Sequence, residues 1–115
     1  RAALAEGVDP KPFNGFDPAA FMPGASDAAA LQSLADLADF NSKTAKTHTG
    51  IYRDITVRKR KTEVDPQVGA VAKIAAAHGI DALLLHRLVE LIHDIEDGRR
   101  EMSAETFHEL TKVMA

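Results

Sequence analysis

Apolar residues between positions 64 and 97 recur at intervals of three and four, and this spacing limits the possible folds more than any other feature of the sequence. Side chains at those intervals lie on one face of an α-helix. The pattern predicts two helices, Glu63–His78 and Ala82–Asp97, because Gly79 separates them and Gly98 follows the second. The predicted inward-facing residues are Val64, Val68, Val71, Ala75, Leu84, Leu85, Leu88, Leu91, Ile92 and Ile95.

The rest of the sequence predicts further helices. Ser26 or Asp27 is expected to cap a helix over residues 28–43, and Ser103 a last short helix. Residues 51–61 suit either a helix or a strand, and we favour a helix because no neighbouring segment supplies a hairpin partner. The expected inward-facing residues of the first and last of these helices are Leu31, Leu34, Ala38, Phe107, Leu110 and Met114. The predicted fold class is all-α.

The composition excludes several classes of protein. A chain of 115 residues has the length of one domain, so residues 1–115 are expected to form a single helical domain. The absence of cysteine excludes a disulfide framework and a Cys-based metal site, and fits a cytoplasmic protein. The net charge of −3 does not indicate nucleic-acid binding, and no apolar run reaches the length of a membrane span. Because the chain begins at Arg1 in what reads as the end of a helix, we expect it to be a piece of a longer protein.

The residues Thr62-Glu63-Val64-Asp65 form a predicted helix start. Thr62 can accept a hydrogen bond from the backbone N–H of Asp65, and Asp65 can reach back to the N–H of Thr62. Glu63 then lies in the first turn, where the positive end of the helix dipole favours a carboxylate. This arrangement holds one acid in a fixed place directly after a basic run. It is either simple capping or part of a site.

Residues 48–65, HTGIYRDITVRKRKTEVD, resemble part of the C-terminal helical domain of ketopantoate reductases. In that family a small polar patch, an R/Q-D-I/V pair and a T-E-[IV]-D motif follow one another at about this spacing. The resemblance implies a multi-helix bundle like the 6-phosphogluconate dehydrogenase C-terminal-like domain. It also implies a preceding Rossmann domain that carries NADPH and is missing from this chain. The whole enzyme would reduce a 2-oxo acid such as 2-dehydropantoate to the 2-hydroxy acid, and this fragment alone would be inactive.

The same resemblance assigns expected site residues. Glu63 matches a glutamate of the active-site cleft, where it works with the substrate and with a catalytic lysine that lies upstream of this chain. Thr49 is the nearest hydroxyl match to the groups that hold the substrate's polar end, and either Thr47 or His48 stands where well-known members have asparagine. Arg53 is expected to attract the substrate carboxylate. The interval from Asp54 to Glu63 is one residue longer than in those members.

Other polar patterns keep two interpretations. The run Arg58–Lys61 is either a solvated helix face or positive charge beside the cleft, where it attracts a carboxylate or the cofactor's phosphate. Nucleic-acid binding is disfavoured because no aromatic residues are interleaved with the basic ones. His86, Glu90 and His93 share a helix face, but two histidines seven residues apart favour a solvated face over a metal site, so no metal is expected.

For the chain as a whole, the alternative function is a stand-alone helical dimerisation or interaction domain without catalysis. In the reductase interpretation, too, the helical domain can form a homodimer interface.

Overall fold

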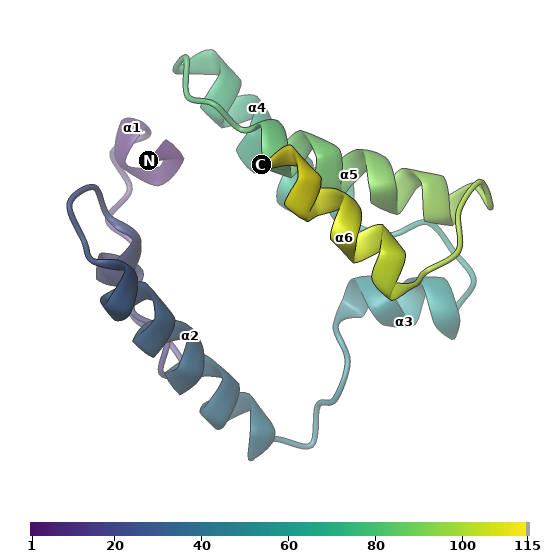
Figure 1. The fold of residues 1–115 in the computed structure, drawn as a ribbon, viewed down its shortest axis with the longest axis horizontal. Coiled ribbons are helices and arrows are strands. Elements are labelled where there is room, and N and C mark those ends of the chain that lie inside the picture. Colours follow the sequence, from purple (N-terminus) through teal and green to yellow (C-terminus); the bar gives the residue numbers. More distant parts are fainter. Residues whose placement is uncertain (115) are drawn as a thin grey trace. The chain divides into compact units, whose positions relative to one another are not determined.

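The computed structural model describes residues 1–114, and every regular element in that range is helical (Figure 1). The elements are α1 (Ala2–Ala5), the 3₁₀-helix η1 (Pro18–Phe21), α2 (Asp27–Ser42), α3 (Gly50–Thr56), the π-helix η2 (Asp65–Gly69), α4 (Ala70–Ala77), α5 (Leu83–Glu96) and α6 (Ala104–Val113). One isolated β-bridge joins Phe13 and Phe16. The predicted all-α fold class is confirmed.

The chain divides into two compact units, one over residues 3–48 and one that begins at Thr49. The expectation of a single domain over residues 1–115 stays a prediction. No helix among residues 1–114 is long and apolar enough to cross a membrane.

A buried serine joins the proline-rich loop of the first unit to α2. Ser33 is only 4% exposed, and its Oγ accepts the Asp17 N–H at 2.7 Å and donates to the Asp17 carbonyl at 3.2 Å. Gly15 also lies very close to α2, since a Cβ there would be 2.8 Å from the carbonyl oxygen of Asp36. Its φ of +82° likewise favours glycine. These contacts hold the loop and η1 against one face of α2.

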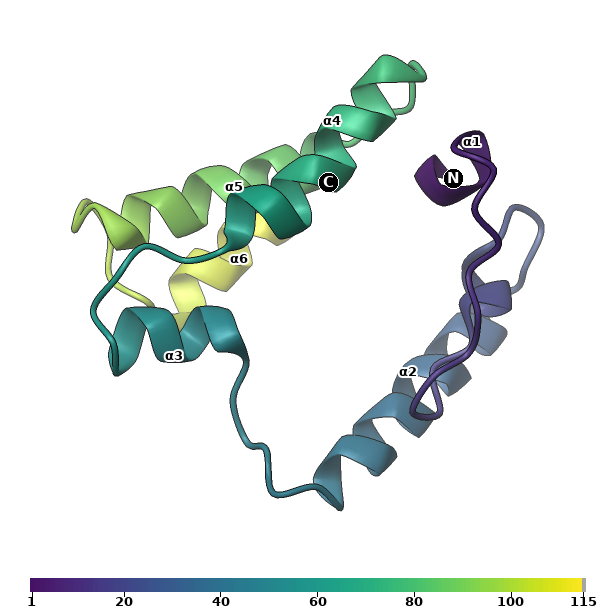
Figure 2. The ribbon, with the colours of Figure 1, turned by 180° about the vertical axis from the view of Figure 1, so that it is seen from behind.

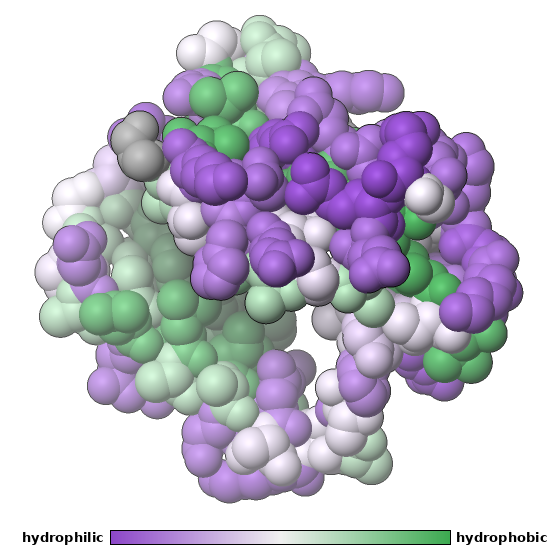
Figure 3. All heavy atoms as spheres, turned by 45° about the vertical axis from the view of Figure 1, so that its right-hand side comes forward, coloured by the Kyte–Doolittle hydropathy of each residue, from purple (hydrophilic) through white to green (hydrophobic). Residues whose placement is uncertain are grey.

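The other face of α2 is exposed, contrary to prediction. The helix begins as expected, with Ser26 Oγ accepting the Ala29 N–H at 3.1 Å. The predicted buried stripe is wrong, however, because Leu31 is 68% exposed and Leu34 is 48% exposed. At about 100° per residue Leu31 lies about 160° and Leu34 about 100° around the helix from Ser33, away from the side on which the loop packs. Figure 3 shows that hydrophobic as well as hydrophilic side chains lie open on the molecular surface.

In the second unit, α5 is the central helix. It packs against η2, α4 and α6. The chain from η2 through α4 runs in the opposite direction to α5, and α6 lies beside α5 (Figures 1 and 2). The predicted helices before and after Gly79 are confirmed to within two residues, and Gly79 and Gly98 end them with φ of +65° and +74°. The buried apolar residues of the unit are Val64, Ala72, Ala75 and Leu91.

Other predictions for this unit are wrong. Val71 and Leu84, which the spacing predicts to face inward, are exposed. The helix expected over residues 51–61 ends at Thr56, because the following segment turns back toward α3 and Lys59 adopts a φ of +52°. In α6, Phe107 and Met114 are exposed rather than inward-facing. Thr106 is buried there instead, and its hydroxyl donates to the Glu101 carbonyl at 2.9 Å.

Candidate functional site

The turn that carries Glu63 is fixed by a side chain from the far end of α5. The Thr62 N–H donates to Glu96 Oε1 at 2.9 Å, and the Thr62 hydroxyl donates to the same oxygen at 2.5 Å. The hydroxyl oxygen in turn accepts the N–H of Val64, which is fully buried, at 3.2 Å. Glu96 therefore takes the part in the reciprocal cap that the sequence assigned to Asp65.

Asp65 pairs with a histidine of α5 rather than with Thr62, so its predicted capping role is wrong. Its Oδ2 lies 2.9 Å from His93 Nε2. Glu90, on the same face of α5 as His93, accepts a hydrogen bond from Arg87 at 3.0 Å. Residues 1–114 contain no group of three or more His, Cys, Asp or Glu side chains that could hold a metal ion.

Glu63 is exposed at the N-terminal end of the helical segment formed by η2 and α4. Its Oε2 accepts a hydrogen bond from Gln67 Nε2 at 3.0 Å, and its carbonyl accepts the Gln67 backbone N–H at 3.1 Å. The positive end of the helix dipole favours a carboxylate in this position. Gln67 thus orients the Glu63 side chain, and the exposed carboxylate keeps lone pairs that can accept a hydrogen bond from a ligand.

Thr49 is the N-cap residue of α3, and Arg53 lies in the last turn of this short helix. Thr49 Oγ1 accepts the Tyr52 N–H at 3.1 Å and so caps the helix, a role that the sequence analysis did not assign to it. The hydroxyl is exposed, and its hydrogen can still donate to a ligand. Arg53 is also exposed, and its carbonyl accepts the N–H groups of Val57 and Arg58 at 3.0 Å.

His48 is the last residue of the first unit. It is exposed, and its Nδ1 lies 2.9 Å from Thr47 Oγ1. Among the described residues of the second unit, no hydrogen bond or ion pair joins Glu63 to Thr49 or Arg53. That these side chains act on one ligand stays a prediction.

A buried carboxylate beside Arg53 is missing from the predicted site residues. Asp54 is 4% exposed, and its Oδ1 accepts hydrogen bonds from Arg58 Nη1 and Arg60 Nε, each at 2.8 Å. The hydrogen bond from Arg58 lowers the pKa of Asp54, and Arg60 adds to this effect, which burial opposes. The four-residue spacing from acid to arginine is the sequence signal that indicates this pair. Asp54 thereby fixes the segment that follows α3.

A family model described as the C-terminal region of ketopantoate reductase, PanE/ApbA, matches residues 19–96, which is more than half of the chain. The chain belongs to this family. No curated protein and no solved structure matches it.

The region that matches the ketopantoate reductase family contains every residue predicted for the site, namely His48, Thr49, Arg53 and Glu63. It ends at Glu96, the residue that holds Thr62 in place. Both partners of the contact that fixes the Glu63 turn therefore lie inside the matched region. The helix α6 lies outside it.

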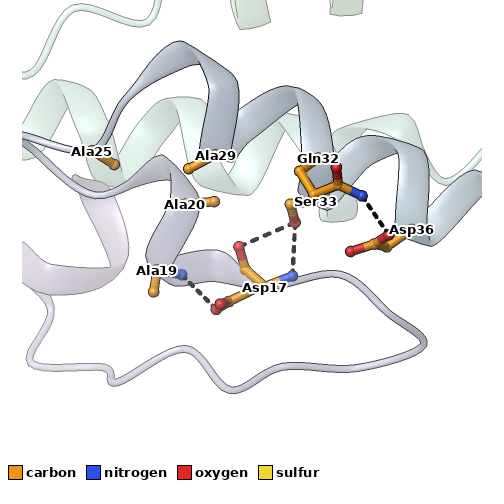
Figure 4. A pocket seen from close by; sticks show the side chains of 8 residues that line it. All are labelled: Asp17, Ala19, Ala20, Ala25, Ala29, Gln32, Ser33 and Asp36. Atoms are coloured by element: carbon orange, nitrogen blue, oxygen red, sulfur yellow. Dashed lines mark hydrogen bonds between the residues drawn. The ribbon is translucent and has the colours of Figure 1, made fainter.

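A pocket of about 380 Å³ in the first unit lies mostly within the same matched region (Figure 4). The methyl groups of four alanines line much of it. Its polar residues are already bonded within the unit, because Ser33 pairs with the Asp17 backbone and Gln32 Nε2 donates to Asp36 Oδ1 at 2.8 Å. Asp17 Oδ1 accepts the Ala19 N–H at 3.0 Å, which caps η1. We therefore read this pocket as packing of the loop on α2.

Proposed function

We propose that this chain is the C-terminal domain of a cytoplasmic, NADPH-dependent oxidoreductase that reduces a 2-oxo acid, such as 2-dehydropantoate, to the 2-hydroxy acid. Membership of the ketopantoate reductase family supports the proposal. The structural observation that carries it is the exposed Glu63 carboxylate, oriented by Gln67 on a turn that Thr62 and Glu96 fix. A carboxylate held in this way is suited to orienting a polar ligand.

Reducing a 2-oxo acid requires a hydride at the carbonyl carbon and a proton at the carbonyl oxygen. NADPH supplies the hydride when it is bound, and the proton comes from the family's lysine, which lies outside this chain. This chain has no G-x-G-x-x-G loop for a dinucleotide, so the proposal assigns none of its residues to cofactor binding.

The residues of this chain would bind the substrate and orient it for the reaction. Glu63 would accept a hydrogen bond from a substrate hydroxyl or from the proton-donating lysine. Arg53 would attract the substrate carboxylate, and the Thr49 hydroxyl and the His48 ring would contact the polar end of the substrate. Each role needs an exposed side chain, and all four residues are exposed.

The test is a kinetic assay of the full-length protein with 2-dehydropantoate and NADPH. Glu63→Gln keeps the size of the side chain and its bond to Gln67 but removes the charge. We expect kcat/KM to fall by about 10²-fold or more, the range of a general acid–base or orienting group. Glu105→Gln is the matched control, because Glu105 is also an exposed first-turn acid and lies on α6, outside the family match. Equal activity of both variants would contradict the proposal.

The exposed leucines of α2 favour a second candidate function, a helical dimerisation or interaction domain. If the chain associates through this face, sedimentation will show a dimer that Leu31→Gln with Leu34→Gln dissociates. A full-length protein that lacks reductase activity but dimerises through α2 would favour this second function over the first.

A further inference from the structure

A pocket of about 430 Å³ lies where the segment after α3 meets the C-terminal end of α5. None of the four predicted site residues lines it. Its lining consists of Ile55, Lys59, Arg60, Lys61, Ile95, Glu96 and Gly98. We propose that this pocket binds a phosphate group, as free phosphate or as part of a small phosphorylated ligand.

The cationic side of the pocket is a fixed turn. Arg60 Nε donates to the buried Asp54 at 2.8 Å, and the Arg60 backbone N–H donates to the Asp54 carbonyl at 3.0 Å. Lys59 between them has a φ of +52°, a left-handed conformation that is uncommon for residues other than glycine and that tends to occur at functional sites. The buried carboxylate therefore determines where the three basic residues stand.

The charge around the pocket suits a dianion. The lining holds three cations, Lys59, Arg60 and Lys61, and one carboxylate, Glu96, which leaves a formal charge of +2. The Asp54 carboxylate already accepts hydrogen bonds from two arginines, Arg58 and Arg60. Glu96 Oε1 already accepts two hydrogen bonds from Thr62. Among residues 1–114, no ion pair involves Lys59 or Lys61. A phosphate monoester carries about −1.5 to −2 charges at pH 7, so it matches this surplus better than a single carboxylate does.

The rest of the lining accommodates an organic group. Ile55 and Ile95 supply apolar surface. The volume lies within the roughly 300–1,000 Å³ of small-molecule sites. The Glu96 carboxylate can also accept a hydrogen bond from a ligand hydroxyl. A phosphorylated sugar fits this lining, because it offers a phosphate to the basic residues, hydroxyls to Glu96 and a carbon skeleton to the two isoleucines. The inference does not rest on the proposed reductase function, because it concerns binding to this chain alone.

The experiment is a titration of the whole chain in phosphate-free buffer at low salt, followed by calorimetry and by amide NMR shifts. The probes are ribose 5-phosphate, ribose and inorganic phosphate. We expect saturable binding of ribose 5-phosphate with shifts at Ile55, Ile95 and Gly98, and no binding of ribose. Inorganic phosphate that binds as tightly as the sugar phosphate would identify free phosphate as the source, and weaker binding would identify a phosphorylated organic ligand. Ribose binding as tightly as its phosphate would overturn the proposal.

The variant Lys59→Asn with Lys61→Gln removes the two unpaired charges, and asparagine at position 59 tolerates the left-handed backbone. We expect affinity for ribose 5-phosphate to fall about tenfold or more, roughly the factor that one charge-assisted hydrogen bond supplies. Lys46→Asn with Lys73→Gln is the control, since it removes the same charge at two exposed lysines outside the pocket.

Equal weakening in the two double variants would show only general charge attraction and would overturn the site. So would binding of a DNA duplex that is tighter than that of the sugar phosphate and disappears with added salt. If the pocket variant unfolds, the NMR shifts of the unaltered chain still decide the matter, because shifts spread over all lysines would contradict a pocket.

Discussion

Thr62 and Glu96 are 34 residues apart in the sequence, and two hydrogen bonds from Thr62 meet on one oxygen of Glu96. One donor is the Thr62 backbone N–H, and the other is its hydroxyl. The contact joins the start of η2 to the end of α5. It fixes the residue immediately before Glu63, so the orientation of the candidate site depends on a helix that carries none of the predicted site residues.

We expect Glu96→Ala to lower the free energy of unfolding by about 1–3 kcal/mol, because it leaves the part-buried Thr62 donors without their acceptor. Urea unfolding measures this loss, and hydrogen exchange of the Thr62 amide should accelerate in the folded state. Glu90→Ala, on the same helix, removes only an exposed pair with Arg87 and should change stability by less than about 0.5 kcal/mol. Equal losses in the two variants would contradict the bridging role.

The Asp54 cluster predicts a dependence of stability on pH. The pKa of Asp54 in the folded state is lower than its ordinary value of 3.8, so the charged carboxylate stabilises the fold above that pH. This contribution is lost as the pH falls through the lower, folded-state pKa. Asp54→Asn should therefore unfold at a lower temperature than the wild type near neutral pH, and the difference should shrink below about pH 4.

Thermal unfolding of both proteins, followed by circular dichroism between neutral pH and pH 2, measures that difference. Asp39→Asn is the control, because Asp39 forms an exposed ion pair with Lys43 and should give little difference at any pH. A difference for Asp54→Asn that persists unchanged to pH 2 would show that the carboxylate charge is not its cause.

Substitutions at Thr49 can separate its role as a helix cap from its proposed role in substrate binding. Thr49→Ala should cost about 1 kcal/mol, the usual value of a lost N-cap, whereas Thr49→Asp retains a cap oxygen and the stability. In the full-length enzyme Thr49→Asp should nevertheless raise KM, because the new charge repels the carboxylate of a 2-oxo acid. Thr49→Ser should preserve both properties. A normal KM for Thr49→Asp would place the substrate elsewhere.

Ser33 should matter for the stability of the first unit. Ser33→Ala removes the partner of both the N–H and the carbonyl of Asp17 in a buried position, so we expect a loss of about 1–3 kcal/mol in urea unfolding. Limited proteolysis should then cut the loop before α2 faster. Ser42→Ala makes the same substitution within α2 at an exposed hydroxyl that bonds only the Asp39 carbonyl. It should leave both measurements nearly unchanged.

Local sequence rules predict the helix ends well, since the Ser26 cap and the positive φ of Gly79 and Gly98 depend only on neighbouring residues. Local rules fail where a side chain far away in the sequence determines a cap or a helix end. No local rule shows that Glu96 rather than Asp65 serves Thr62. Likewise, two arginines beyond Thr56 bond Asp54, and the helix expected through residue 61 ends early.

The prediction of which face of α2 is buried fails for a different reason. Leucine spacing identifies an apolar face but not the segment that will cover it, and the loop packs on another side of the helix through Ser33. For the candidate site, the sequence predicts which residues are chemically suited. It does not predict the contacts that orient them, because Gln67 and Glu96 have no recognisable motif of their own.

The π-helical turn η2 sets the angle around the helix axis between the Glu63 turn before it and the helix α4 after it. Its wider winding, in which the Ala70 N–H bonds the Asp65 carbonyl, holds one residue more than an α-helical turn would. A one-residue deletion between positions 65 and 69 would turn Glu63 and the fully buried Val64 together by about 100° around the helix axis relative to Ala72 and Ala75. The extra residue of η2 therefore sets the direction of Glu63 and the burial of Val64 at the same time, so a deletion here could not re-aim the acid without also rebuilding the core.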